Sequence, residues 1–219
     1  MKLCAICGVN RATTVDHIPP QGLYPKPRPN GVQLHTVPAC ARCNNGSSVE
    51  DEEFKVMICL ITGEFRENAQ EVIDWIAKTL GKNKKLLRKI LKTRFRTYTY
   101  LRSSILEPAI GMVFSGEHYQ SVMARIVRAL YWRETGRALG KTPSVTIIPY
   151  EQITSALDRQ SFRNLMDYLE PIHLNNSTFI YKASFLEDGS SIWGLMFFNR
   201  HFVAAYADPP SAIIEPPPS

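Results

Sequence analysis

Hydrophobic positions after residue 47 recur every three to four residues in five stretches, which is typical of amphipathic helices. The clearest stretch runs from His118 to Thr135, because its apolar side chains share one face and Gly136 ends it. Ser47 and Glu50 have the spacing of a capping box at a helix start. We therefore expect helices over residues 47–61, 64–80, 83–93, 118–135 and 160–169.

Other stretches are short and β-prone, and some of them alternate polar and apolar side chains as strands do. Two of them flank a loop at residues 19–29 that contains five prolines. Asp188-Gly189 is a plausible hairpin turn near the end of the chain. We expect strands over residues 13–18, 32–37, 94–102, 145–148, 179–185, 192–198 and 202–206. This pattern predicts an α+β fold in which a C-terminal antiparallel β meander follows a helical region.

The composition indicates a globular protein, since 44% of the 219 residues are hydrophobic and can form a core. No apolar run reaches membrane-spanning length, and the first residues lack the apolar segment of a signal peptide. We therefore expect a soluble cytoplasmic protein that does not bind membranes. The tail at residues 209–219 is rich in proline and is predicted to be disordered or extended.

Positive charge is concentrated in the first two-thirds of the chain. Residues 1–150 contain 22 Lys and Arg against 12 Asp and Glu, whereas residues 151–219 contain 4 against 8. Between Trp75 and Leu106 there are ten basic residues and no acidic residue, so pairing within the helices cannot balance them. This run predicts contacts with a nucleic-acid backbone through Lys82, Lys84, Lys85, Arg88, Lys89, Lys92, Arg94, Arg96 and Arg102. Arg125, Arg128 and Arg133 either extend this patch or solvate the outer face of their helix.

The cysteines indicate a metal site in the first 46 residues. Cys4 and Cys7 form one C-x-x-C pair, and Cys40 and Cys43 form a second. Two such pairs supply the four thiolates of a structural zinc site. The zinc ion would hold together a module too small to be stable through its core alone. Cys59 lies in an apolar run and is predicted to be a small buried side chain.

A second set of polar residues lies between and beside these pairs. Asp16 and His17 precede Ile18-Pro19-Pro20, and Asn44 directly follows the second pair. A carboxylate and an amide oxygen suit a hard divalent ion, and an imidazole that titrates near neutral pH can take a proton from water. The four acids at residues 50–53 offer similar oxygens, but they lie in a first helical turn and are expected to be structural or solvated.

The order Cys-x-x-Cys, Asp-His-Ile-x-Pro, Cys-x-x-Cys-Asn resembles the HNH endonucleases, the zinc-stapled branch of the ββα-metal nucleases. The resemblance covers about the first 60 residues. It implies a ββα module at residues 1–62, and the helix and strand patterns after it predict a basic helical and antiparallel β domain at residues 63–208. It also implies that His17 is the general base, and that Asp16 and Asn44 bind one catalytic Mg²⁺ or Mn²⁺ ion. Asn45 is the alternative to Asn44 if the register shifts by one residue.

One position departs from the family pattern. The family has an Asn a few residues before the second cysteine pair, where it orients the base, and this chain has His35 there. His35 could replace that Asn as a hydrogen-bond partner, could bind metal, or could mark a weakened site. The alternative is a solvated loop histidine.

The sequence therefore predicts a metal-dependent endonuclease that nicks or cuts DNA, with RNA as the other candidate substrate. The alternative is a zinc-stapled nucleic-acid-binding module whose nuclease centre is degenerate. The C-terminal β region, which has no catalytic pattern, is a candidate surface for a second copy or a partner protein. From resemblance alone, a phage or antiphage-defence role is the expected setting.

Overall fold

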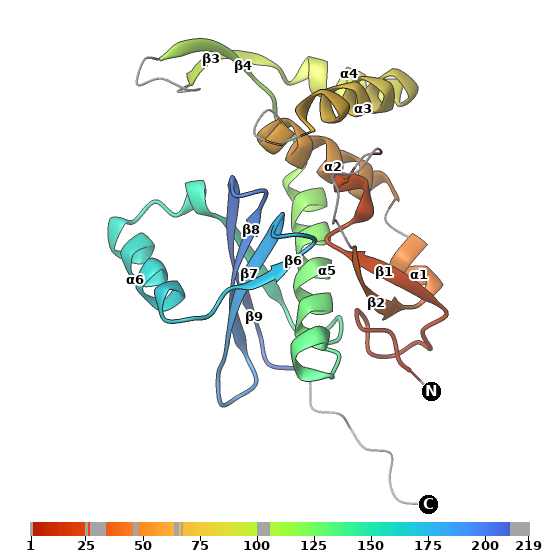
Figure 1. Ribbon diagram of the computed structural model, residues 1–219, viewed down its shortest axis with the longest axis vertical. Helices are drawn as coiled ribbons and strands as arrows, with labels where there is room; N and C mark the ends of the chain where they lie inside the picture. Colours follow the sequence, from red (N-terminus) through yellow and green to blue (C-terminus); the bar gives the residue numbers. More distant parts are fainter. Residues whose placement is uncertain are drawn as a thin grey trace, which may run out of the picture.

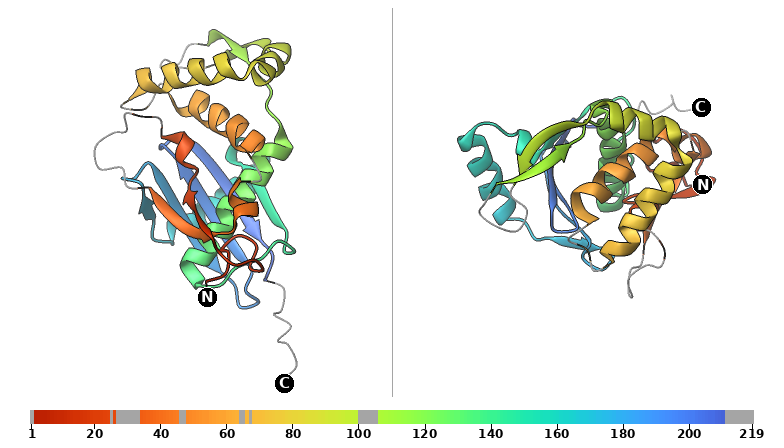
Figure 2. Two further views of the ribbon diagram at one scale, coloured as in Figure 1. Left: turned by 90° about the vertical axis from the view of Figure 1, so that its right-hand side faces the viewer. Right: turned by 90° about the horizontal axis from the view of Figure 1, so that it is seen from above.

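The computed structural model describes residues 2–24, 26, 34–45, 48–63, 66, 68–99 and 106–210. Helix α5 (Gly116–Thr135) runs through the middle of the molecule (Figure 1). A five-stranded sheet lies on one side of α5 and the N-terminal module lies on the other, while α2 to α4 cover one end. Figure 2 shows the sheet, α5, the N-terminal module and helices α2 to α4 from two further directions.

The N-terminal module is a hairpin followed by a short helix. Strand β1 (Thr14–Ile18) pairs antiparallel with β2 (His35–Ala39), and α1 (Ala41–Asn45) follows β2 after a single residue. A 3-10 turn, η1 (Gln21–Leu23), lies in the proline-rich connection, of which residues 25 and 27–33 are outside the description. The sequence predicted both strands but placed the helix that follows them at residues 47–61, so the short helix α1 was not expected.

Three helices follow: α2 (Ser48–Thr62), α3 (Ala69–Lys82) and α4 (Lys84–Lys92). Helix α4 is strongly amphipathic, since Leu86 and Ile90 are buried while its lysines and Arg88 are exposed. The Asn83 side chain begins this helix by accepting a hydrogen bond from the Leu86 N–H at 2.9 Å. Strands β3 (Phe95–Thr99) and β4 (Glu107–Gly111) then form a two-stranded ribbon that extends from the body (Figure 1).

Helix α5 has well-defined ends. The Ser115 hydroxyl accepts a hydrogen bond from His118 N–H, and Gly136 adopts a φ of 70° directly after the last turn. The left-handed conformation at Gly136 costs little because glycine has no Cβ atom. The apolar face predicted for this helix is buried, including Val122, Met123 and Val127.

The C-terminal sheet is antiparallel throughout, with the strand order β5-β9-β8-β7-β6. Its strands are β5 (Val145–Pro149), β6 (Ile172–Leu174), β7 (Phe179–Phe185), β8 (Ser191–Phe197) and β9 (His201–Ala207). A 3-10 turn, η3 (Tyr150–Gln152), and α6 (Ala156–Asp167) connect β5 to β6. Gly189, in the predicted turn between β7 and β8, has a φ of 85°.

The predicted α+β class, with a C-terminal antiparallel sheet, is confirmed. One hydrophobic core runs through the whole molecule, from Ile18 and Val37 of the hairpin, across α2 and α5, to Trp193 and Phe197 of the sheet. The segments on either side of residue 62 share this core. The domain boundary expected there stays a prediction. Cys59 is buried in the core, as predicted. None of the described helices combines the length and the apolar character needed to span a bilayer.

Candidate metal centre and active site

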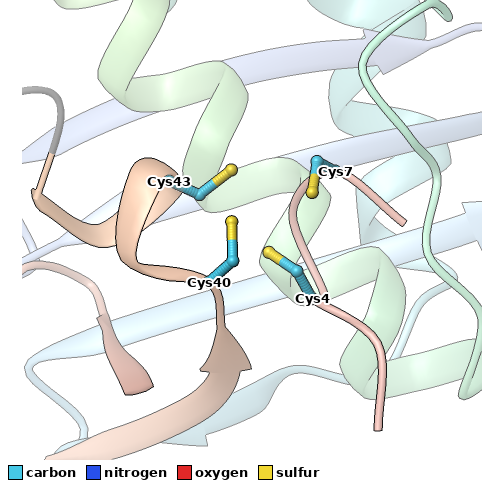
Figure 3. A group of neighbouring side chains, drawn as sticks. All are labelled: Cys4, Cys7, Cys40 and Cys43. Carbon is cyan, nitrogen blue, oxygen red and sulfur yellow. The ribbon is translucent and has the colours of Figure 1, made fainter. Parts of the chain in front are cut away.

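Four cysteine side chains meet between the N-terminal turn and the start of α1. The sulfur atoms of Cys4, Cys7, Cys40 and Cys43 all lie within 4.8 Å of one another, and all four residues are buried. Figure 3 shows these side chains gathered around one space from the two segments. A structural zinc ion takes four thiolates in a tetrahedron, so this cluster can hold a metal ion such as zinc.

The backbone shapes each half of this cluster into a tight turn. In the first half, the Gly8 N–H donates to the Cys4 carbonyl at 2.9 Å, and Gly8 has a φ of 69°. In the second half, the Cys43 and Asn44 N–H groups both donate to the Cys40 carbonyl at 3.0 Å. Local hydrogen bonds therefore hold each cysteine pair in its turn, and the Ala5 N–H links the first turn to β2 by donating to the Pro38 carbonyl at 2.8 Å.

The thiols differ in how readily they lose a proton. Burial acts to raise the pKa of Cys40, but hydrogen bonds from the Cys43 backbone and the Asn10 side chain outweigh it and lower the pKa to about 6. Burial raises the pKa of Cys4, and it raises that of Cys43 further. Zinc binds cysteines as thiolates, so an ion that binds this cluster displaces the remaining thiol protons.

The hairpin determines where the other predicted site residues point. The β1–β2 ladder pairs His17 with Thr36 and Ile18 with His35. Because side chains alternate along a strand and paired residues share a face, His17 and Thr36 belong to one face. Asp16, Ile18 and His35 belong to the other, on which Ile18 is buried. His17 and His35 therefore lie on opposite faces of the hairpin.

Asp16 contacts Arg125 of α5, a partner that sequence spacing does not predict. Its Oδ2 atom lies 3.4 Å from Arg125 Nε, and Arg125 Nη2 also contacts the Asp51 carboxylate of α2. The Asp16 Oδ1 atom accepts the His17 backbone N–H at 2.9 Å. Burial raises the pKa of Asp16 and the Asp51 charge adds to this effect, while Arg125 opposes it. Arg125 therefore links β1, α2 and α5.

Asn44 lies beside β1, but its amide nitrogen faces the strand. Its Nδ2 atom donates to the Val15 carbonyl at 2.9 Å and to the Thr14 hydroxyl at 3.2 Å. These bonds fix α1 against the hairpin. Asn45, the alternative ligand, is exposed at the end of α1.

His35 is a connecting residue in this structure. Its backbone N–H donates to Asn175 Oδ1 at 3.1 Å, and its Nδ1 atom lies 3.3 Å from Arg133 Nη1. Burial lowers the pKa of His35, and the neighbouring Arg133 charge lowers it further. His35 therefore favours the neutral imidazole and contacts the C-terminal half of the molecule.

Asp16 and Asn44, the ligands predicted for a magnesium or manganese ion, both have protein partners in this structure. Arg125 offsets the charge of Asp16, and Asn44 presents its NH₂ group to β1. Among the histidines, cysteines and acids that the structure describes, only the four cysteines gather in a group of three or more at ligand spacing. The catalytic ion therefore stays a prediction.

A basic cavity of about 420 Å³ lies between the cysteine cluster and α5. Four cationic side chains line it: Arg42, Arg125, Arg128 and Lys141. Arg128 is held by the Gly140 and Pro143 carbonyls at 2.7 and 3.1 Å. Arg125, which contacts Asp16, connects this cavity to the predicted active centre. The cavity can accept an anionic group such as a phosphate.

The four acids at residues 50–53 all contact other elements. Glu50 accepts the Ser121 hydroxyl, Asp51 contacts Arg125, and Glu52 contacts Asn83. Glu53 is bonded to Lys89 and His118. None of these contacts could be read from sequence spacing, because each partner lies 31 or more residues away.

The residues predicted to bind nucleic acid lie on α3, α4 and β3, except Arg102, which is outside the described part of the chain. Those on α4 are exposed, as are Arg94 and Arg96 beside and within β3. Arg125 is not solvated on an outer face of the long helix, since it is only 8% exposed.

A comparison of the chain with known protein families, curated proteins and solved structures finds no match.

Proposed function

We propose that this protein is an HNH-type endonuclease that hydrolyses phosphodiester bonds in DNA. The observation that carries the proposal is the cationic cavity between the cysteine cluster and α5, which shares Arg125 with Asp16. The same part of the chain contains a strand–strand–helix unit, four clustered cysteines and the Asp-His-Ile-x-Pro sequence. Of these, Cys43 lines the cavity and Asp16 contacts its Arg125. RNA remains the other candidate substrate.

In this proposal the residues of the chain have distinct roles. The cations of the cavity hold the phosphate and offset the charge that develops on its oxygens. The family resemblance assigns to His17 the proton of the attacking water; His17 lies on the hairpin face opposite Asp16 and outside the lining of the cavity. Asn44 holds α1 against β1, and the cysteine cluster fixes the hairpin to which His17 belongs. A divalent ion in this family would supply Lewis-acid stabilisation of the leaving oxygen.

Plasmid cleavage tests the assignment of the base. Supercoiled plasmid is incubated with the wild-type protein and with His17→Ala, in magnesium and separately in manganese. Loss of a general base should reduce nicking by about 100-fold or more. His173→Ala is the control, because His173 is an exposed histidine of β6 whose ring contacts Ser177. Equal nicking by wild type and His17→Ala would refute the role of His17.

The zinc content and the DNA affinity of each variant are measured in parallel. His17→Ala should keep both, because His17 belongs neither to the cysteine cluster nor to the cationic cavity. A loss of zinc in His17→Ala would show that its inactivity reflects a damaged fold rather than a missing base. His35→Ala then tests the family departure, and its place on the opposite face predicts nicking close to that of wild type.

The second candidate function is DNA binding without cleavage, and the Arg125 contact favours it. The Arg125 guanidinium contacts both Asp16 and Asp51, so a protein cation already offsets the charge of Asp16, the predicted metal ligand. Wild-type protein that binds plasmid but cuts it in neither metal would select this candidate over the nuclease.

A further inference from the structure

A second cavity, of about 700 Å³, lies on the other side of α2, where α4 meets the start of α5. Lys85, Arg88, Lys89 and Lys92 of α4 line it together with His118 of α5. Arg88 and Lys89 each lie three or four positions from both Lys85 and Lys92, so the four residues occupy one face of the helix. The cavity is separate from the cysteine cluster and shares no lining residue with the first basic cavity.

A buried carboxylate organises the wall of this cavity. Glu53 has a side-chain exposure of 4%, and both of its oxygens lie 2.8 Å from Lys89 Nζ. Its Oε1 atom also accepts the Ser115 N–H at 2.8 Å, and its Oε2 atom lies 2.6 Å from His118 Nδ1. Glu53 therefore fixes one lysine and one histidine in the lining, and its hydrogen-bonding capacity is used inside the protein.

The charge of Glu53 is matched by Lys89, which leaves Lys85, Arg88 and Lys92. Within the described residues, none of these three side chains forms an ion pair with a carboxylate. Three like charges around one cavity repel one another, and an anion that enters the cavity relieves this repulsion. Because Nδ1 of His118 is engaged by Glu53, Nε2 is the ring nitrogen that remains for a ligand.

We propose that this α4–α5 cavity is a phosphate-binding site. Its ligand is a phosphate ester, supplied either by a nucleic-acid backbone or by a free nucleotide. Lys85, Arg88 and Lys92 pair with the phosphate oxygens, and Glu53 acts as a positioning residue that holds Lys89 and His118 beside them. The nucleic-acid source rests on the proposed function, but binding at this site does not depend on cleavage.

The geometry of α5 relates the two cavities to each other. His118 lines the second cavity and Arg125 lines the first, seven residues further along the helix. Seven residues are about two turns, so both side chains occupy one face with roughly 10 Å of helix between them. Helix α2 covers this face, since its Glu53, Glu50 and Asp51 contact His118, Ser121 and Arg125, so the two cavities are separate sites.

Binding of a single-stranded oligonucleotide without a terminal phosphate tests the site on the full-length protein. The cavity variant is Lys85→Gln with Lys92→Gln, and the matched control is Lys2→Gln with Lys78→Gln. Both control lysines are exposed and outside the lining of both basic cavities, and each pair removes two positive charges. Affinity is measured at several salt concentrations, with no magnesium or manganese added so that the strand stays intact.

Loss of two phosphate contacts should lower the steepness of the fall of log affinity with log salt by about 1.4 in the cavity variant. The control variant should keep the wild-type slope. If both pairs of substitutions lower the slope equally, the α4 lysines act only through general charge and the proposal is wrong. His118→Gln should also weaken binding, since it removes one lining group without changing the α4 charges.

A nucleoside monophosphate separates the two sources of phosphate. Binding of the mononucleotide that is lost in the cavity variant and kept in the control assigns the site to a free nucleotide. Binding of the oligonucleotide alone, with the same dependence on the cavity residues, assigns it to the backbone. If the binding of neither ligand depends on the cavity residues, the proposal is wrong. The cleavage assay with His17→Ala reports separately on the proposed nuclease.

Discussion

Arg125 is the residue whose position was hardest to foresee, and it affects the candidate centre most directly. Its guanidinium contacts two carboxylates, Asp16 of β1 and Asp51 of α2, and all three side chains are mostly buried. Breaking such an arrangement leaves two acids close together in a partly dry environment. The raised pKa of Asp16 already reflects its burial and the nearby Asp51 charge.

Arg125→Met should therefore destabilise the protein by about 3 kcal/mol, because the two carboxylates lose the cation between them. It should also create a response to magnesium, since two adjacent carboxylates are hard oxygen ligands for this ion. Thermal unfolding with and without magnesium measures both effects. Arg133→Met is the control, because Arg133 contacts Glu134, Tyr181 and His35 but not Asp16. A variant as insensitive to magnesium as wild type would argue against a latent ion site.

The sequence identified Asp16, His17 and the four cysteines as neighbours because they follow one another within 43 residues. Arg125 comes from a helix more than 100 residues later, and only the packing of α5 against the hairpin brings it to Asp16. Its charge was visible in the sequence, but its partner was not. The same is true of Glu53, whose three partners lie on α4 and at the start of α5.

At the scale of elements, the turn between β6 and β7 connects the sheet to the N-terminal module. Asn175, Asn176 and Ser177 have consecutive φ values of 52°, 57° and 59°, which only a few residue types adopt readily. Asn175 is buried, and its side chain accepts from His35 N–H and donates to the Ile18 carbonyl and the Tyr24 hydroxyl. One side chain of this turn therefore binds β1, β2 and the residue after η1.

Asn175→Ala should lower stability by about 2 to 4 kcal/mol, because it leaves buried polar groups of the hairpin without partners and places alanine in a left-handed conformation. Asn176→Ala is a close control, since Asn176 has the same backbone conformation and an exposed side chain. It should cost about 1 kcal/mol or less. Chemical denaturation measures both variants. Equal losses would mean that backbone conformation alone explains the effect and that the link to the hairpin contributes little.

The elements themselves differ in how well the sequence predicts them. Helix α5 was expected almost to the residue, because a long amphipathic period and a terminal glycine agree with its tertiary packing. Strand β4 was not expected, since Pro108 and Gly111 are unfavourable in strands and it forms only by pairing with β3. Helix α1 was also not expected, because five residues are too few to show a helical period.

For the whole molecule, α2 and α5 form the frame on which both proposed phosphate sites depend. Asp51 and Glu53 leave α2 in different directions, and each organises cations of one cavity. The sequence predicted both basic regions as charge but could not divide them into two cavities. That division results from where α2 packs between the N-terminal module and α4 (Figure 1).

The cysteine cluster is a small core of its own beside the main one. Its buried residues are Cys4, Ile6, Cys7, Ala39, Cys40 and Cys43. The adjacent residues Ala5, Ile18 and Val37 belong instead to the main core, which continues into α5 and the sheet. The metal should therefore determine the order of the turns around it, while the rest of the chain is held by apolar packing.

Removal of zinc should accordingly unfold the cysteine turns and leave α5 folded. Hydrogen exchange before and after chelation measures this difference at individual amides. The N–H groups of Gly8, Cys43 and Asn44 should lose protection, because each of them donates to a cysteine carbonyl within its own turn. The protection of Val122 to Val127 in α5 should persist.

Metal analysis should give one zinc per chain, and Cys59→Ala should keep it, since Cys59 lies outside the cluster. Unchanged protection of the Gly8 and Cys43 amides after complete removal of zinc would show that the turns do not need the ion. An equal loss of amide protection in α5 would show that the two cores are a single cooperative unit.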